Sequence, residues 1–147
     1  MTQTIRERIL AAFTTKLENI TTVIDLNVER NRTTEVTKYP TLIVIDGNQS
    51  TDNSNTSFTT YQLQVSVEGY VQDDADKVGS AVNTLYGETV KAILADITLG
   101  NLCFDIQEED MVVDLDRGEG HAPQMAFLLQ FSVSYMTKQN DPYTLAP

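Results

Sequence analysis

The residue types that most often perform chemistry are scarce in this chain. It has one histidine, His121, and one cysteine, Cys103, so neither a usual zinc site nor an intrachain disulfide can be built from them. A hydrolase would use His121 as a base beside Asp116 or Glu119, but no nucleophile motif accompanies these residues. Cys103 stands in an apolar stretch, where thiols usually pack without reacting. We therefore expect no catalytic residue, no cofactor and no bound metal.

Two acidic stretches have some of the spacing of calcium-binding loops. Residues 46–53 lack the alternating acidic ligands and the terminal glutamate of such a loop, and residues 114–119 place Arg117 where the cation would sit. No glycine-rich loop with a following lysine is present to hold a phosphate. Both acidic stretches are therefore expected to be turns.

Acidic side chains gather in the middle of the sequence. The 147 residues carry a formal net charge of -11, and residues 39–121 hold three basic and fifteen acidic side chains. A segment this acidic repels phosphate groups, so it is not expected to read a DNA sequence. It is expected to face solvent, a protein partner or the lumen of a pore. The side chains that would face a lumen are Asp105, Glu108, Glu109, Asp110, Asp114, Asp116 and Glu119.

Length and hydropathy predict one soluble domain. Residues 1–20 mix charged and apolar side chains, which is not the pattern of a signal peptide, and the apolar runs at 42–45 and 125–129 are too short to cross a bilayer. We expect a single domain over residues 1–136, an extended polar tail over residues 137–147 and no membrane contact.

Two segments have the period of an amphipathic helix. Residues 2–20 place apolar side chains three and four apart, and Thr4 with Glu7 forms the pattern of a capping box. The second helix is expected to open at the aspartates of residues 73–76, where carboxylates meet the positive end of the helix dipole, and to end near Leu99-Gly100.

Five segments have the pattern of strands. A strand with one wet face is expected over residues 23–29, a fully buried one over 41–45, and strands with clean alternation over 61–71 and 125–135. The apolar residues of the stretch 102–115 change parity across Glu108-Glu109-Asp110. Since parity cannot change within a regular strand, a bulge or turn is expected there.

Polar segments separate these elements. Residues 48–57 contain no apolar residue and are expected to form a mobile loop, and residues 116–121 are expected to form a loop or hairpin tip. The element order predicts an α+β fold with two helices packed on one face of a largely antiparallel, or mixed, sheet of about four to five strands. The opposite, more polar face of the sheet would then be free for a partner.

Four segments of the chain follow one another in a distinctive order. They are the amphipathic helix of residues 2–20, the Tyr39-Pro40-Thr41-Leu42-Ile43-Val44-Ile45 run, the strand of residues 61–71 with its Asp73-Asp74 continuation, and the Phe131–Thr137 run with Asp141-Pro142. In these segments the chain resembles the tail-terminator proteins, also called tail-completion or neck proteins, of long-tailed bacteriophages and gene-transfer particles. The resemblance covers most of the chain in element order.

The resemblance implies a structural protein of the virion that is assembled in the host cytoplasm. Such a subunit forms a homo-oligomer, a hexameric ring, on the last ring of the major tail tube protein and stops further tube growth. Its other face meets a head-tail connector or stopper protein, and DNA only passes through the ring. The residues we expect at these interfaces are Arg30, Arg32, Lys38, Asn48, Asp52, Asn53, Lys138, Asp141 and Tyr143.

Three alternatives stay open at this point. A head-side stopper or connector component of the neck would share most of these features. An acidic protein that mimics DNA and inhibits a host nuclease would need carboxylates spaced along a surface, whereas here they cluster in one stretch. A small hydrolase would need a site around His121.

Overall fold

The computed structural model describes residues 2–147 as two helices and one sheet. The helices are α1 (Ile5–Glu18) and α2 (Val78–Leu94). The strands are β1 (Asn27–Arg30), β2 (Thr41–Asp52), β3 (Phe58–Gln72), β4 (Asp105–Asp116), β5 (Gln124–Lys138) and β6 (Asp141–Leu145).

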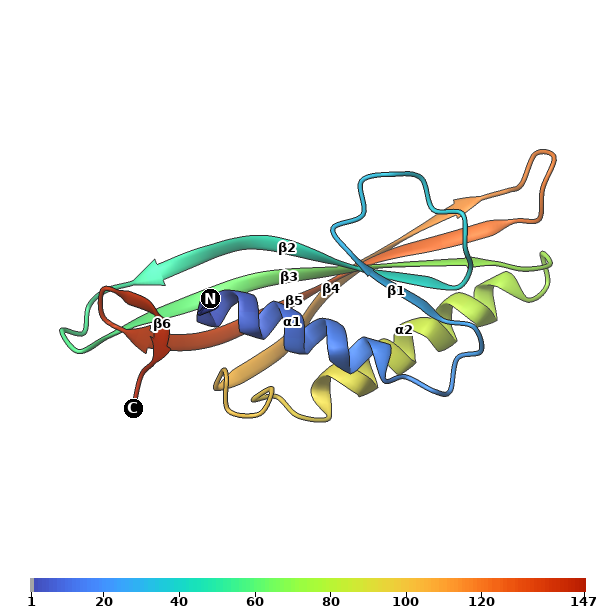
Figure 1. Ribbon diagram of the computed structural model, residues 1–147. Helices are drawn as coiled ribbons and strands as arrows, with labels where there is room; N and C mark the ends of the chain where they lie inside the picture. The colour runs from blue at the N-terminus through green and yellow to red at the C-terminus, as the bar shows by residue number, and fades with distance from the viewer. Residues whose placement is uncertain (1) are drawn as a thin grey trace.

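The sheet is long and mixed. Its strand order is β1-β2-β3-β5-β4, with β6 also paired to β5, and only the pair β1 and β2 is parallel. Both helices lie on one side of the sheet (Figure 1). The α+β fold with a mostly antiparallel sheet is therefore confirmed, and the sheet has six strands where four to five were expected.

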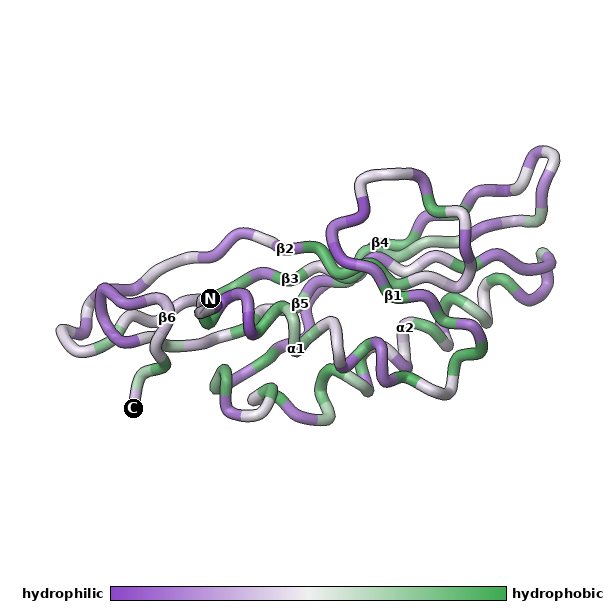
Figure 2. Tube along the Cα trace, in the orientation of Figure 1, coloured by the Kyte–Doolittle hydropathy of each residue, from purple (hydrophilic) through white to green (hydrophobic). Residues whose placement is uncertain are grey.

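One core lies between the helices and the middle of the sheet. In β3 the side chains of Leu63, Val65 and Val67 are buried on the helix side, as the alternation predicts. The rings of Phe13 in α1 and Phe131 in β5 meet edge to face, with centroids 5.4 Å apart. Burial of each such large side chain stabilises the fold by roughly 1.5–3 kcal/mol. Figure 2 shows the hydrophobic residues concentrated in the middle of the sheet and on the helices.

The close packing of β3 on β5 depends on one glycine. Gly69 pairs with Phe127 across the two strands, and a Cβ atom on Gly69 would lie 2.2 Å from a ring carbon of Phe127. The ring therefore occupies the space that a side chain on residue 69 would need. Tyr86 of α2 packs edge to face on the same ring, which fixes the helix over the sheet.

The face of the sheet opposite the helices is polar over most of its area. Gln62, Gln64 and Ser66 of β3 point to this side, as expected for an uncovered face. The segment 31–40 rises over one corner of it (Figure 1). Ile43 points to this face and is buried nonetheless. The expectation that residues 41–45 are covered on both faces thus holds for residues 41–44.

The helices begin and end differently from the sequence expectation. The Thr4 hydroxyl accepts the Glu7 amide at 3.0 Å, which is one half of the predicted capping box. The other half is absent, because the Glu7 carboxylate bonds Arg30. Helix α2 begins at Val78, after a turn, so the aspartates of residues 73–76 precede its first turn. It also ends at Leu94, before the expected Leu99-Gly100 stop.

Two predicted local structures were wrong. The strand expected over residues 23–29 begins only at Asn27, and the side chain of Ile24 is 82% exposed, although Leu26 and Val28 of the same predicted face pack against the core. Half of the mobile loop expected over residues 48–57 is strand, because β2 runs to Asp52, and residues 53–57 form the loop before β3 starts at Phe58. The polar residues of the strand half are held by backbone pairing, which needs no apolar side chain.

The C-terminal segment also pairs with the sheet. β5 runs to Lys138, and the polar residues that were expected to form an extended tail contain β6, which folds back on the end of β5. Thr137 is buried there. A hairpin rather than a loose tail therefore closes the described chain.

Candidate functional site

Strand β4 forms one border of the sheet. It pairs with β5 on one side, and among residues 2–147 no strand pairs with its outer side. No side chain of the described residues bonds its backbone between residues 106 and 115. Because a β-strand directs alternate N–H and C=O groups to its two sides, the outer side of β4 presents a row of unpaired backbone groups.

The same strand carries most of the predicted lumen-facing carboxylates. β4 contains six acidic side chains and no basic one. Glu108 accepts the Tyr86 hydroxyl at 2.6 Å, and this hydrogen bond raises the pKa of Tyr86. Asp116 accepts the Gly118 amide at 3.0 Å in the turn that follows. The four others have no side-chain hydrogen bond or ion pair with the described residues, and they are Asp105, Glu109, Asp110 and Asp114.

Exposed aliphatic side chains stand between these carboxylates. Val112 is 65% exposed on the open face of the sheet, and Val113 and Leu115 are 44% and 46% exposed on the helix face. Val113 and Leu115 stay exposed because α2 packs over β3 and β5 and hardly reaches β4.

A cavity continues the apolar surface from β4 toward α2. It has a volume of about 380 Å³ and lies between the start of α2 and the β4–β5 hairpin. Its walls include Leu115 and Met125 from the strands, Val78 from the helix, and Pro123 and Arg117 from the hairpin. The aliphatic side chains on the helix face of β4 therefore border a larger uncovered apolar area.

The parity switch in β4 is a bulge, as predicted. The register with β5 shifts between Glu108 and Met111, so Glu109 and Asp110 together stand opposite the single residue Gln130, and β4 has one extra residue there. Such a bulge twists an edge strand locally and interrupts its straight outer side. The outer side that remains regular runs from Met111 to Asp116.

Arg30, expected at an interface, is instead held inside the subunit. Its guanidinium donates to both oxygens of Glu7 at 2.7 and 2.9 Å and to both oxygens of Asp46 at 2.9 and 2.7 Å. These hydrogen bonds lower the pKa of Glu7 and of Asp46 and raise that of Arg30. Arg30 thereby ties α1 to β1 and β2, and its donors face these two partners.

The other two basic candidates differ from each other. Arg32 donates to Glu29 at 2.7 Å and to the carbonyl groups of Thr34 and Glu35, which shapes the segment 31–40. Lys38 has an exposed side chain with no ion-pair partner among the described residues. Lys38 is thus the one cation of this trio whose charge is available to a neighbour.

At the border of the sheet next to β1, side chains bond part of the β2 backbone. Beyond β1, the Asp46 amide donates to the Asn31 side chain at 3.0 Å, and Arg6 donates to the Gly47 carbonyl. Arg6 also donates to the Gln49 side chain at 3.0 Å. The β2 backbone therefore has side-chain partners at Asp46 and Gly47, just beyond the residues that pair with β1.

The β2–β3 hairpin carries Asn48, Asp52 and Asn53 away from the core. All three side chains are exposed. Asp52 accepts the Ser54 amide, which lowers the pKa of Asp52, and Asn53 accepts the Thr59 hydroxyl. The hairpin is a defined arm, and its loop proper is residues 53–57.

The C-terminal candidates lie at the same end of the sheet. Lys138 ends β5 and is exposed, and Asp141 and Tyr143 belong to β6. Asp141 accepts the Tyr143 amide and the Thr144 hydroxyl, and the latter bond is the largest cause of its lowered pKa. Tyr143 is 48% exposed. The structure thus brings the β2–β3 arm and β6 to one end of the sheet, whereas β4 runs toward the other end (Figure 1).

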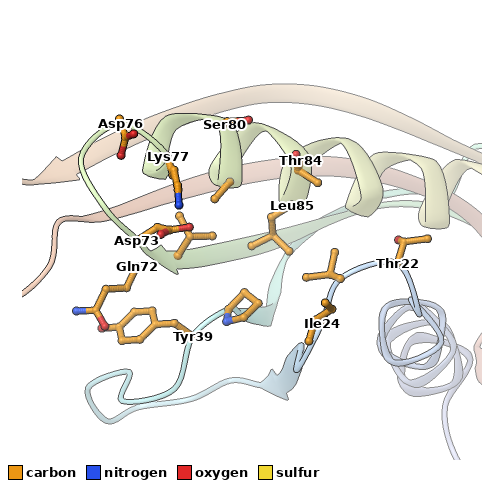
Figure 3. Close-up of a pocket in the computed structure, with 14 residues that line it drawn as sticks. Thr22, Ile24, Tyr39, Gln72, Asp73, Asp76, Lys77, Ser80, Thr84 and Leu85 are labelled. Atoms are coloured by element: carbon orange, nitrogen blue, oxygen red, sulfur yellow. The ribbon is translucent and has the colours of Figure 1, made fainter.

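A groove of about 640 Å³ lies beside the first turns of α2. Figure 3 shows Ser80, Thr84 and Leu85 on its helix wall, with Ile24 and Tyr39 on the facing segments. Asp73, Asp76 and Lys77 close one end. Its walls are mixed in polarity, and they bring no group of three metal-ligating side chains together in the described part of the chain.

His121 and Cys103, the residue types most often used in catalysis, lie in different surroundings. The Nε2 atom of His121 lies 3.8 Å from Asp116, and its Nδ1 atom is 2.7 Å from the Ala122 carbonyl, in an exposed turn. Glu119 is exposed in the same turn. Cys103 is buried, which raises its pKa to about 12 and keeps the thiol protonated. The first calcium-like stretch is strand, with Asp46 bound to Arg30.

The sequence interpretation missed the importance of Val112, because an apolar residue inside a strand is normally counted as core. The signal was present in its neighbours, since two carboxylates precede and two follow the pair Val112-Val113 within three residues.

Among residues 2–147, no helix is long and apolar enough to span a membrane. A scan against models of known protein families gives no match, and neither does a search of curated proteins.

Proposed function

We propose that this chain is a structural subunit of a phage-like particle, a tail terminator that forms a ring at the head-proximal end of the tail. The ring would cap the tube protein, stop its polymerisation and present a surface to a connector or stopper protein. It would be assembled in the host cytoplasm and remain in the virion, and DNA would only pass through it.

The observation that carries this proposal is the way the sheet extends beyond its helices. The β2–β3 hairpin and β6 project polar, exposed side chains at one end, and β4 presents an unpaired border. These parts bury few side chains within the subunit, so we assign them to contacts with other molecules. Element order, with the run at residues 39–45 and the close at residues 131–142, adds the resemblance to tail terminators.

Ring formation needs two different surfaces that meet between neighbouring copies. A contact of this heterologous kind closes when its rotation divides a full circle. We assign this contact to Lys38, to the arm residues Asn48, Asp52 and Asn53, and to the β6 end with Lys138, Asp141 and Tyr143. Arg30 and Arg32 support the contact only indirectly, because their guanidinium groups are bound within the subunit.

Native mass spectrometry and negative-stain imaging of the purified protein test this proposal. Six-fold rings, lost on replacing residues 53–57 by a two-residue Asn-Gly turn of the type that closes tight hairpins, support it. A protein that stays monomeric both alone and on isolated tail tubes contradicts it. Particles that lack the gene separate the two neck roles, because loss of a terminator gives tails of abnormal length, whereas loss of a stopper gives tails of normal length without heads.

A further inference from the structure

We propose that the outer side of β4 binds an extended, basic segment of a different protein, which adds to the sheet as a further β-strand. This inference goes beyond ring formation and holds whether or not the chain forms rings.

The backbone of β4 provides the first requirement of strand addition. From Met111 to Asp116 the strand is regular, and its outer N–H and C=O groups have no partner among the described residues. An added strand would give each of these groups a ladder hydrogen bond. At the opposite border, Asn31 and Arg6 already bond the backbone of Asp46 and Gly47, so an added strand could not pair with β2 at these two positions.

The side chains of β4 provide the second requirement, which is specificity. Val112 projects on one face of the sheet and Val113 and Leu115 on the other, so an incoming strand meets apolar surface on both faces. Together with the cavity between α2 and the β4–β5 hairpin, this surface favours a segment whose aliphatic side chains can cover it.

The charge of β4 selects the occupant. Its six carboxylates have no ion pair with a lysine or arginine among residues 2–147, and they would face the side chains of an added strand. A second copy of β4 would place carboxylate against carboxylate, which is repulsive. The described strands offer no better match, because Arg30 is bound to Glu7 and Asp46 while β2 and β6 carry aspartates on their borders. A strand with Lys or Arg alternating with aliphatic residues, from another protein, is complementary.

A lumen lining is the competing role for these carboxylates. Like-charge repulsion of DNA needs acidic side chains, but it gives no reason for Val112, Val113 and Leu115 to remain exposed. Strand addition explains the carboxylates and the aliphatic side chains together.

Peptide binding to the full chain tests this directly. The probe alternates Lys with Val or Thr over about ten residues, which is long enough to pair with the regular residues 111–116 at ~3.4 Å per residue. We expect binding that weakens with salt, and hydrogen-exchange protection that appears in residues 111–116. Two peptides are compared, each N-methylated at every second amide, one at the even and one at the odd positions. Binding should weaken about tenfold or more only in the peptide whose methylated amides face β4. Replacement of Lys by Glu should abolish binding.

Matched variants separate this edge from net charge. The triple variant Glu109→Gln, Asp110→Asn, Asp114→Asn should bind the peptide about tenfold more weakly, because three exposed charge pairs are lost. The control Glu18→Gln, Asp25→Asn, Glu35→Gln changes the net charge equally, at exposed residues of α1 and of the segments that flank β1, and should bind as the parent does. Circular dichroism checks that both variants are folded.

Several results would overturn the inference. These are no binding by the folded parent, equal binding after either alternation of amide methylation, equal weakening in both triple variants, or protection that maps outside β4. Protection of β4 that grows with protein concentration and needs no peptide identifies a second copy as the occupant and also overturns it. Ring formation is measured without peptide, so its failure is seen separately.

Discussion

The two borders of the sheet use charge in opposite ways. At the β1–β2 border, Arg30 joins Glu7 and Asp46, and Arg6 and Asn31 bond the β2 backbone. At the β4 border, the six carboxylates have no ion pair with a lysine or arginine, and the outer backbone of β4 has no partner, among residues 2–147. The first border thus joins its charged side chains within the subunit, whereas at the second border four of the six carboxylates have no side-chain bond in the described chain. Charged residues in a sequence therefore mark an interface only when the fold leaves them unpaired.

The largest expected effect comes from removing the cation that closes the first border. Arg30→Met leaves Glu7 and Asp46 close together with no counter-charge, so we expect a loss of about 2–3 kcal/mol in the free energy of unfolding, measured by urea denaturation. This is below the cost for a fully buried pair because the Arg30 side chain is 25% exposed. Arg32→Met, which breaks one more peripheral pair, serves as the control and should cost about 1 kcal/mol or less. Equal losses would show that the two-carboxylate arrangement has no special role.

A bulge at the first border, where the register of β2 on β3 shifts between Asp46 and Gln49, gives the next effect. A Cβ atom on Gly47 would lie 2.1 Å from the backbone oxygen of Gln64, so Gly47→Ala must displace β2 against β3. We expect a loss of about 1–3 kcal/mol in the same measurement. Gly79→Ala is the matched control, since no atom lies within 4 Å of its added methyl group and alanine favours a helix. A Gly47→Ala protein as stable as the parent would show that this border is more adaptable than its contacts indicate.

A pH titration sharpens the comparison with a smaller effect. The folded state lowers the pKa of Glu7 and Asp46, so their ion pairs with Arg30 stabilise the protein above the unfolded pKa values near 4. This stability is lost as the pH falls through the lowered folded values. Arg30→Met should therefore flatten the decline in urea midpoint between about pH 5 and pH 2. An unchanged pH profile in this variant would assign the acid sensitivity to other carboxylates.

The smallest effect on stability is expected at the β4 border. The triple variant Glu109→Gln, Asp110→Asn, Asp114→Asn removes charges that have no partner in the described chain, so the urea midpoint should stay unchanged or rise slightly as repulsion falls. Repeating the measurement at high salt should remove any rise. A fall as large as that of Arg30→Met would mean that these carboxylates support the fold and are not reserved for a partner.

Much of the fold follows from local patterns in the sequence. The alternation of β3 and the stripe of α1 follow from apolar residues that the core buries. The change of parity predicts the bulge in β4, although Val113 and Leu115 are exposed there. The β2–β3 arm and β6 escaped prediction because backbone hydrogen bonds hold them, and those bonds leave no hydropathy pattern. The alternation around Ile24 misled, since that side chain is exposed.

The candidate site was harder to predict than the fold. The carboxylates of residues 105–116 are evident in the sequence, but only the strand order shows that they border the sheet. The pairing of Arg30 with Glu7 and Asp46 joins residues 23 and 16 positions apart. Sequence spacing gave no indication of that pairing, so the basic segment was expected to be free.

Amide hydrogen exchange of the monomeric protein, resolved by residue, tests the contrast between the borders most directly. We predict strong protection of Leu42, Ile43 and Val44, and an alternation of fast and slow amides along residues 111–116, because only every second amide of β4 bonds β5. Uniform protection of residues 111–116 at a concentration where the protein is monomeric would contradict the account, since it would mean that the subunit already covers its acidic border.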